Sequence, residues 1–147
     1  MTIPKRTQAP GTYFVTTACW QRRRLFQVTR NADLFLSVLE HYREHYLLHG
    51  FVIMPDHLHL MLSPIDITLE RAMQLIKGGS SFRYAKEIGP KMEVWQKGFT
   101  DHRVRNADEY RTRMNYMFQN PVRARLVAEG AIYPYSSASG KMANGFY

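Results

Sequence analysis

The chain has 147 residues, a mass of 17.2 kDa and a single cysteine, Cys19. This length suits one domain, and one cysteine excludes both an internal disulfide and a zinc site built on cysteines. Lys and Arg outnumber Asp and Glu by 20 to 12, which gives a net charge of +8 and a pI near 9.8. A basic surface of this kind favours a polyanionic partner such as nucleic acid.

At the start of the chain we expect no targeting signal. The first residues, MTIPKRTQAPG, lack the apolar core of a signal peptide, and no apolar run approaches the length of a membrane span. A free thiol suits a reducing compartment, so we expect a cytoplasmic protein with no membrane partner. We also expect one domain over residues 1–147, in which residues 1–11 form an extended basic arm and residues 136–147 a loose tail.

The first third of the chain predicts a strand followed by a helix. Tyr13–Ala18 is β-branched and aromatic, which is typical of a strand. A basic loop with three consecutive arginines, Arg22–Arg24, comes next. Apolar residues then recur at helical spacing from Asn31 to Leu48, and Gly50 is expected to end this helix.

The middle of the chain predicts a hairpin and a second helix. Phe51–Met54 and the strictly alternating His57–Ser63 form two strands around the turn residues Pro55-Asp56. Residues 68–87 have helical character, interrupted at Gly78-Gly79.

The last part of the chain completes the fold. Val94–Val104 contains a fourth strand, and Asn106 caps a helix that is expected to end before Pro121. A short helix over Val122–Ala128 should follow. The resulting order, β-α-β-β-α-β and a C-terminal helix, predicts an α+β fold of the ferredoxin-like plan, an antiparallel sheet with helices on one face.

The strand His57–Ser63 carries the first chemical signal. Because side chains alternate along a strand, Leu58, Leu60 and Leu62 point to the core, and His57 and His59 point to the other face. Two imidazoles at this spacing can hold one metal ion from the same side. The alternative is a polar strand face that happens to carry two histidines.

The helix from Asn106 carries the second signal. Its apolar stripe consists of Tyr110, Met114, Met117 and Phe118. Tyr116 lies far from this stripe, on a face that it shares with Asn120. The amide oxygen of Asn120 would complete a metal site with His57 and His59. The alternatives are a partly exposed tyrosine and an asparagine that caps a new helix at Pro121.

A metal ion beside a tyrosine favours strand transfer over hydrolysis. The ion would act as a Lewis acid on a phosphodiester, and the Tyr116 hydroxyl would attack the phosphorus. The products would be a 5′-phosphotyrosine and a free 3′-hydroxyl. Because the covalent link conserves the bond energy, the strand could later be rejoined.

Taken together, the chain resembles the single-tyrosine HUH transposases, and within them the REP-associated tyrosine transposases. The segments that carry the resemblance are GTYFVTTAC (11–19), FVIMPDHLHLML (51–62), VWQKGFTDHRVRN (94–106), YMFQNPVRARLV (116–127) and YPYSS (133–137). The resemblance implies that His57 and His59 are the metal-binding pair, that Tyr116 is the nucleophile and that Asn120 is a third metal ligand.

The resemblance also implies a substrate and a cofactor. Such bacterial proteins cut and rejoin single-stranded DNA beside imperfect hairpins, the REP palindromes, with Mg²⁺ or Mn²⁺. We therefore expect an enzyme associated with the nucleoid. The Asn-Pro step at Asn120 favours the REP-associated branch, and with it a monomer over a homodimer.

Basic residues mark possible contacts to DNA phosphates. The candidates are Arg22, Arg23, Arg24, Lys77, Arg83, Arg103, Arg105 and Arg123. The alternative for each of them is a solvated surface charge.

Two other functions compete with strand transfer. One is a catalytically silent nucleic-acid-binding module on a ferredoxin-like sheet. The other is a metallohydrolase, since residues 41–45 spell H-x-x-E-H. We favour a solvated helix edge for that motif, because zincins need a third ligand and a larger scaffold.

Overall fold

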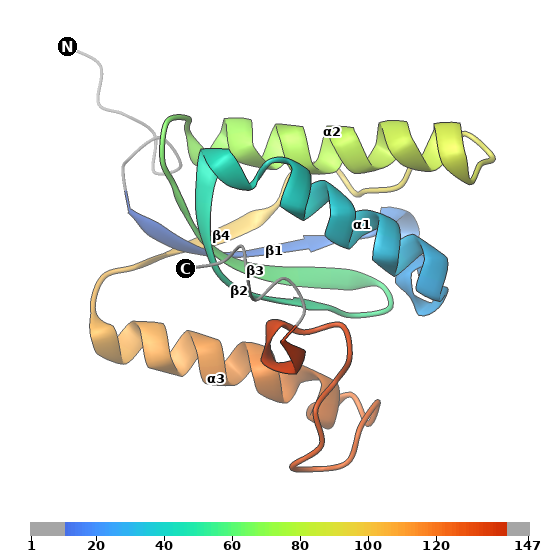
Figure 1. Cartoon of the computed structure of the whole chain (residues 1–147). Helices are drawn as coiled ribbons and strands as arrows, with labels where there is room; N and C mark the ends of the chain where they lie inside the picture. Colours follow the sequence, from blue (N-terminus) through green and yellow to red (C-terminus); the bar gives the residue numbers. More distant parts are fainter. Residues whose placement is uncertain (1–10, 141–147) are drawn as a thin grey trace.

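Four strands form one antiparallel sheet in the computed structural model, which describes residues 11–140 (Figure 1). The strands are β1 (Thr12–Ala18), β2 (Tyr46–Ile53), β3 (His57–Pro64) and β4 (Thr100–Val104), in the order β2-β3-β1-β4. The helices are α1 (Thr29–His41), α2 (Leu69–Glu87) and α3 (Ala107–Arg123). This α+β arrangement, with β1 and β3 in the centre, confirms the predicted ferredoxin-like plan, in which α1 and α2 share one face of the sheet, and the C-terminal helix α3 adds a layer on the other face.

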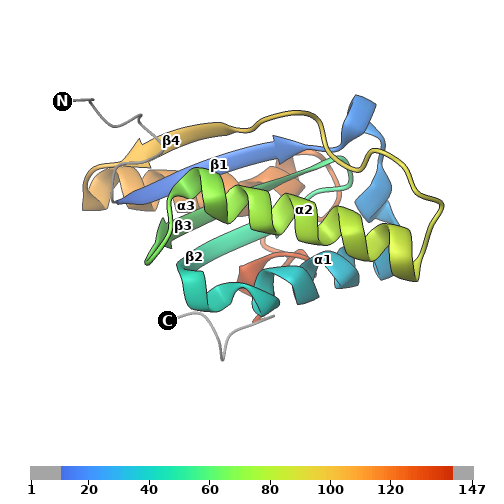
Figure 2. The ribbon, with the colours of Figure 1, turned by 90° about the horizontal axis from the view of Figure 1, so that it is seen from above.

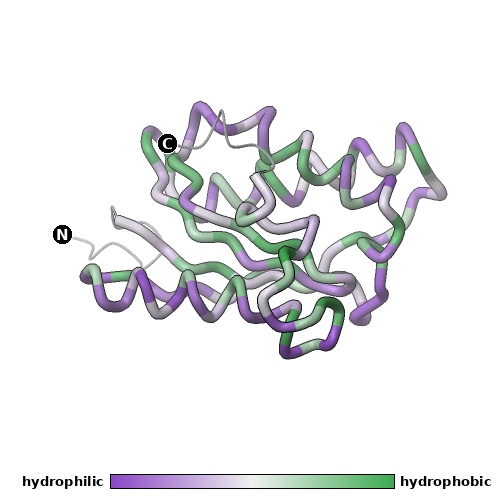
Figure 3. Tube along the Cα trace, turned by 60° about the horizontal axis from the view of Figure 1, so that its bottom comes forward, coloured by the Kyte–Doolittle hydropathy of each residue, from purple (hydrophilic) through white to green (hydrophobic). Residues whose placement is uncertain are grey.

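Helices cover both faces of the sheet. Helices α1 and α2 lie together on one face, and α3 lies on the other (Figures 1 and 2). The larger core fills the space under α1 and α2 and includes the three leucines of β3, Leu58, Leu60 and Leu62. Hydrophobic segments gather in the central strands, whereas the helices alternate between hydrophobic and hydrophilic segments (Figure 3).

A smaller core joins the sheet to α3. Its buried members are Phe14, Val52, Met54, Met61 and Met117. The apolar stripe predicted on this helix faces the same cluster, with Tyr110, Met114 and Phe118 partly buried around it. The sheet is therefore buried on both faces, and α3 packs across β1, β2 and β3.

The helix predicted from Asn31 to Leu48 is too long. Helix α1 ends at His41, and β2 already begins at Tyr46. The side chains from Tyr46 to Leu48 alternate between buried and exposed, as in a strand. The Tyr46 hydroxyl also donates a hydrogen bond of 2.6 Å to the Leu39 carbonyl near the end of α1, which closes the connection.

Gly50 does not end a helix but lies inside β2. A β-bulge between Leu48 and Gly50 interrupts the regular pairing of β2 with β3. A Cβ atom at Gly50 would lie 2.8 Å from the terminal methyl carbons of both Met114 and Met117. Glycine at this position therefore allows α3 to approach the sheet closely.

Helix α2 runs without a break through Gly78-Gly79, where an interruption was predicted. Thr68 caps its start by accepting a hydrogen bond from the Arg71 backbone N–H. Within residues 11–140, no helix is both long and apolar enough to cross a membrane.

Helix α3 also extends further than predicted. Asn106 caps it by accepting a hydrogen bond of 2.8 Å from the Glu109 backbone N–H, as expected. The helix then continues through Pro121 to Arg123, because the fixed φ of proline suits a helix. Proline at position 121 removes the bond that an N–H there would donate to the Met117 carbonyl, and its ring crowds that carbonyl. The separate helix predicted over Val122–Ala128 does not form.

The end of the described chain is packed rather than loose. Ser136 is buried and forms a bridge with Val52, and the Ser137 hydroxyl accepts a hydrogen bond of 3.0 Å from the Phe51 backbone N–H. The prediction of a loose tail is therefore wrong for residues 136–140. Residues 141–147 and the predicted arm, apart from its last residue, lie outside the described part of the chain.

The two glycines of α2 allow a test of its packing. A Cβ at exposed Gly78 meets nothing within 4 Å, whereas a Cβ at Gly79 would lie 2.9 Å from the Tyr42 ring. Gly78→Ala should raise the free energy of unfolding by about 0.5–1 kcal/mol through helix propensity. Gly79→Ala should lose this gain, because the ring must move. Urea denaturation of the two variants measures the difference, and equal gains would contradict the close Gly79–Tyr42 contact.

Candidate active site

The two histidines of β3 lie together on the face of the sheet that α3 covers. Their ring centroids are 4.9 Å apart, and the rings are nearly perpendicular. The His59 ring stacks on Phe14, with 5.2 Å between the centroids and an angle of 18°. Because the leucines of β3 face the opposite core, the predicted division of this strand between two faces is confirmed.

Each imidazole is held through its Nδ1 atom. His57 Nδ1 lies 2.7 Å from Oδ1 of Asp56, and a carboxylate can only accept, so this nitrogen carries the proton. In the neutral form of His57, the lone pair is therefore on Nε2. His59 Nδ1 shares a hydrogen bond of 2.8 Å with the Thr16 hydroxyl, which lies opposite it on β1. Both rings thus have fixed orientations, as metal-binding histidines require.

His59 is the more deeply buried of the two, with 4% of its surface exposed. Burial lowers the pKa of His59 from 6.5 to about 3, and the charges of His57, Arg123 and Arg22 act in the same direction. The imidazole is consequently neutral at physiological pH. A neutral imidazole has a lone pair to offer to a metal ion.

Tyr116 approaches the histidines from α3. Its ring centroid is 5.9 Å from that of His59 and 6.0 Å from that of Phe14, both in edge-to-face geometry. On its other side, the Arg123 guanidinium lies 4.3 Å from the ring centroid and donates a hydrogen bond of 3.0 Å to the Tyr116 carbonyl. With 41% of its surface exposed, the residue is held by its neighbours but open to a substrate.

Asn120 reaches the same place one turn later on α3. Its side-chain nitrogen is 3.3 Å from Nε2 of His59. Oxygen and nitrogen of an amide are assigned from their neighbours, so the same position suits the amide oxygen as a metal ligand. Because α3 continues through this residue, Asn120 does not cap a new helix. The alternative role as an N-cap is excluded.

These residues provide a mixed nitrogen and oxygen donor set. In the described chain, no group of three or more His, Cys, Asp or Glu side chains is arranged to hold a metal ion. A metal site here would use two imidazole nitrogens and one amide oxygen, with its remaining positions open to water or phosphate oxygens. This set suits a divalent cation that must also bind a substrate.

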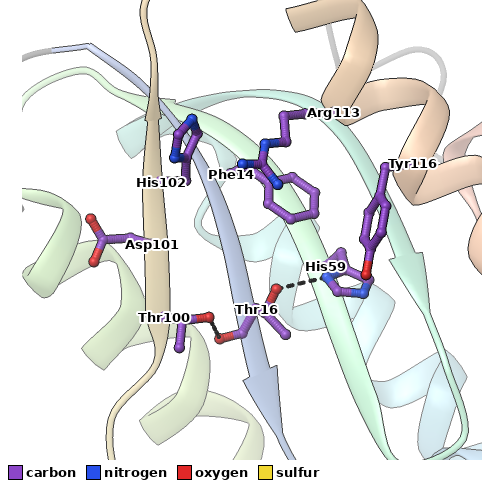
Figure 4. Close-up of a pocket in the computed structure, with 8 residues that line it drawn as sticks. All are labelled: Phe14, Thr16, His59, Thr100, Asp101, His102, Arg113 and Tyr116. Carbon is purple, nitrogen blue, oxygen red and sulfur yellow. Dashed lines mark hydrogen bonds between the residues drawn. The ribbon is translucent and has the colours of Figure 1, made fainter. Parts of the chain in front are cut away.

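A pocket of about 280 Å³ opens beside Tyr116 (Figure 4). Besides Tyr116 and His59, it is lined by Phe14, Thr16, Thr100, Asp101, His102 and Arg113. The Arg113 guanidinium lies 5.5 Å from the centroid of the Phe14 ring. The pocket therefore places a cation and a tyrosine hydroxyl on the same side of a buried imidazole, which suits a phosphate group.

Two of the basic residues predicted to contact DNA lie at this site. Arg123 packs on Tyr116, as described above. Arg22 extends from the loop after β1, and its Nε atom is 3.8 Å from Oδ2 of Asp56. Both charges also act on the pKa of His59, so the site combines two fixed cations with a neutral imidazole.

Three other predicted contacts are engaged by the protein itself. The Lys77 ammonium donates hydrogen bonds to backbone carbonyls, at 2.5 Å for Gly98. Arg83 pairs with the Glu87 carboxylate at 2.6 Å. Both residues belong to α2, across the sheet from α3 (Figure 1). Arg23 is bonded to the segment before β4.

The last three predicted contacts lie elsewhere. Arg24 bonds to Gln27, and Arg105 lies in the exposed link before α3. Arg103 is paired with Tyr13 in the sheet and shares the face of the larger core. The described residues that line the Tyr116 pocket include none of these three.

Several residues of the site were not predicted, among them Asp56, Phe14, Thr16 and Arg113. Asp56 was read only as a turn residue, although a carboxylate directly before His57 was a usable signal. Phe14 and Thr16 contact His59 through the pairing of β1 with β3, and that register cannot be read from the composition of either strand.

The comparisons with known proteins agree with this geometry. The family described as IS200-like transposase matches residues 11–120. The REP-associated tyrosine transposase of Escherichia coli K12 is 28% identical over 140 residues, which cover 93% of this chain and 82% of that protein. The resemblance predicted from the sequence is confirmed.

Solved structures extend the comparison. The structure of a REP-associated tyrosine transposase bound to a REP hairpin matches with a TM-score of 0.74 and 25% identity, covering 100% of this chain and 88% of the other. A structure from Deinococcus radiodurans has a TM-score of 0.53 and 16% identity, covering 79% of this chain and 95% of the other, and shows the shared fold alone.

The buried state of His59 predicts a pH dependence of stability. In metal-free protein, the unfolded chain binds a proton near pH 6.5, whereas folded His59 does so only near pH 3. The stability from this difference is complete above pH 6.5 and is lost as the pH falls, by up to about 1.4 kcal/mol per pH unit. His59→Gln should therefore give a shallower loss between these limits. Urea denaturation at several pH values, with a chelator present, measures both slopes, and equal slopes would contradict the prediction.

Proposed function

The chain belongs to the IS200-like transposase family, and we propose that it cuts and rejoins single-stranded DNA through a covalent bond to Tyr116. A relative of known structure is bound to a REP hairpin, and we propose REP-like hairpins with unpaired flanks as the substrate here. The observation that carries the proposal is the convergence of Tyr116 and Asn120 from α3 on His59 from β3.

The proposed reaction is a transesterification. The Tyr116 hydroxyl loses its proton, and its oxygen forms a bond to the phosphorus of the scissile phosphodiester. The bond from phosphorus to the 3′-oxygen breaks, and that oxygen takes up a proton. The 5′-phosphate is then attached to Tyr116, and attack by a 3′-hydroxyl reverses the step and rejoins a strand.

The side chains around Tyr116 have distinct roles in this proposal. Phe14 and His59 flank the ring from the sheet, and Arg123 fixes it from the solvent side, so the hydroxyl has few alternative positions. Arg113 and Arg123 would bind the phosphate oxygens as charge builds up on them.

We propose Mg²⁺ or Mn²⁺ as the cofactor. His57, His59 and Asn120 would hold it, and Asp56 and Thr16 would keep the two rings in place. When bound, the ion would supply Lewis-acid polarisation of the phosphodiester. The mixed donor set and the neutral state of His59 support this assignment.

We further propose that a single chain is sufficient for catalysis. The nucleophile and all three proposed ligands come from one chain, so no second copy is needed to complete the site. A chromosomal hairpin substrate implies that the protein acts at the bacterial nucleoid, in the cytoplasm.

Loss of the tyrosine hydroxyl tests the covalent step. With a labelled hairpin oligonucleotide that carries unpaired flanks and Mg²⁺ or Mn²⁺, the protein should form an adduct that survives a denaturing gel. Tyr116→Phe should abolish this adduct and leave hairpin affinity within about twofold, because only the nucleophile is removed.

Tyr110→Phe is the matched control. It removes a hydroxyl from the same helix, but one that contacts His49 rather than the site, and it keeps the ring that packs edge-to-face on His49 and helps to hold α3. This variant should still form the adduct. Binding without an adduct under either metal would contradict the proposed chemistry and leave a nucleic-acid-binding module without catalysis.

Removal of one imidazole tests the metal site. His57→Ala should weaken Mn²⁺ binding at least about tenfold. Removing a residue that only supports a metal ligand typically costs this much affinity, and removing the ligand itself should cost more. Cleavage should fail while hairpin binding persists. Mn²⁺ affinity, measured by electron paramagnetic resonance, provides a readout that does not depend on activity.

His45→Ala serves as the control for this experiment. His45 pairs with Asp66 and is remote from the histidines of β3 in sequence and contacts. Its variant should bind Mn²⁺ as the unchanged protein does. If His57→Ala bound Mn²⁺ equally well, the histidines would have a structural role only.

A further inference from the structure

A second groove continues directly from the Tyr116 pocket. It has a volume of about 520 Å³ and is lined by residues 16–18 at the end of β1, by Arg22 and by residues 96–100. Thr16 of β1 and Thr100 of β4, which are paired in the sheet, line both hollows, so the two hollows adjoin on the face of the sheet. Figure 4 shows both threonines at the edge of the Tyr116 pocket. Any chain that enters the pocket can extend into this groove.

The lining of the groove suits a phosphodiester chain. Arg22 and Lys97 are cationic and exposed, and none of the described residues that line it is acidic. Threonine hydroxyls and the backbone of residues 96–98 supply hydrogen-bonding groups. Positive charge with polar walls and no anionic group fits single-stranded nucleic acid better than an apolar or cationic ligand.

Hydrogen bonds from neighbouring elements hold residues 96–98, which form one wall of the groove. The Lys77 ammonium, reaching across from α2, donates hydrogen bonds to the carbonyls of Gln96 and Gly98, at 2.8 and 2.5 Å. The Thr17 hydroxyl also donates to the Gly98 carbonyl, at 3.4 Å. Lys77, predicted from the sequence as a phosphate contact, therefore fixes the wall of a groove instead of facing its interior.

Arg22, one of the two cations of the groove, lies in a turn with an unusual backbone conformation. Gln21 and Arg22 are consecutive residues with φ of 54° and 55°, a left-handed conformation that costs non-glycine residues about 1 kcal/mol each. The flanking chain holds this turn in place, because the Cys19 and Phe26 amides donate to the carbonyls of Asp56 and Pro55. The strained turn keeps Arg22 beside the histidine pair.

We propose that this groove binds the unpaired nucleotides next to the scissile phosphate, with Arg22 and Lys97 contacting their backbone phosphates. The inference rests on the proposed function, which places the scissile phosphate at Tyr116. A single strand cut there must leave the pocket, and the adjoining groove, entered past Thr16 and Thr100, provides a cationic exit.

Fluorescence anisotropy with two labelled probes tests the groove. One probe is a short oligothymidylate strand, and the other is a hairpin without unpaired ends. The double variant Arg22→Gln/Lys97→Gln should bind the oligothymidylate on the order of tenfold more weakly, and the plot of log affinity against log salt should become shallower by about 1.4, the value for two single-strand phosphate contacts. Its affinity for the blunt hairpin should change much less.

A charge-matched double variant provides the control. Arg71→Gln/Lys91→Gln removes the same charge from exposed positions outside the groove. It should leave both affinities and the salt slope nearly unchanged. Equal losses in the two double variants, or no loss in the first, would overturn the inference.

The binding test of the groove and the adduct test of Tyr116 can fail independently of each other. If single-strand binding depends on Arg22 and Lys97 but Tyr116 forms no adduct, the groove stands and the chemistry fails. If the adduct forms but the groove variant binds oligothymidylate normally, the chemistry stands and the groove assignment fails.

Discussion

The packing of Met117 into the lower face of the sheet determines where the candidate active site forms. Met117 is fully buried between Phe14, Met61 and their neighbours. At about 100° per residue, Arg113, Tyr116 and Asn120 all lie on the same side of Met117 around the helix. Burying this one methionine therefore turns Tyr116 and Asn120 toward His59 together.

The depth of that packing depends on Gly50. Its missing side chain leaves room for the methyl groups of Met114 and Met117. At the other half of the helix, Tyr110 contacts His49, and His49 is hydrogen-bonded to Ser63 of β3 at 2.8 Å. Helix α3 is thus held at two points along its length, by van der Waals contact at one and by polar contacts at the other. A helix held in this way can position a reactive side chain without a second subunit.

The sequence predicted the parts of this arrangement that depend on local periodicity. Alternation along β3 separates its leucines from its histidines, and helical spacing separates Tyr116 from the apolar stripe. The sequence-based prediction was wrong where tertiary contacts determine the secondary structure. Tyr46 fits a helical stripe as well as a strand, and its hydrogen bond to Leu39 exists only once the chain has turned. Local rules predict that a helix ends before Pro121. In the structure α3 continues through Pro121, so Asn120 lies within the helix, beside His59. The eight basic residues look alike in sequence, and only the fold separates Arg22 and Arg123 from the internally bonded Lys77 and Arg83.

The electrostatics of the site separate two demands that would otherwise conflict. A phosphate is attracted by positive charge, but a histidine that supplied this charge would be protonated and could not bind a metal ion. Here burial keeps His59 neutral, and Arg22 and Arg123 lower its pKa further. The arginines stay charged at any physiological pH, and each is fixed independently, Arg22 by a strained turn and Arg123 by the Tyr116 ring and carbonyl. The cations that would attract the DNA therefore add to the effect of burial, which keeps the proposed metal ligand neutral.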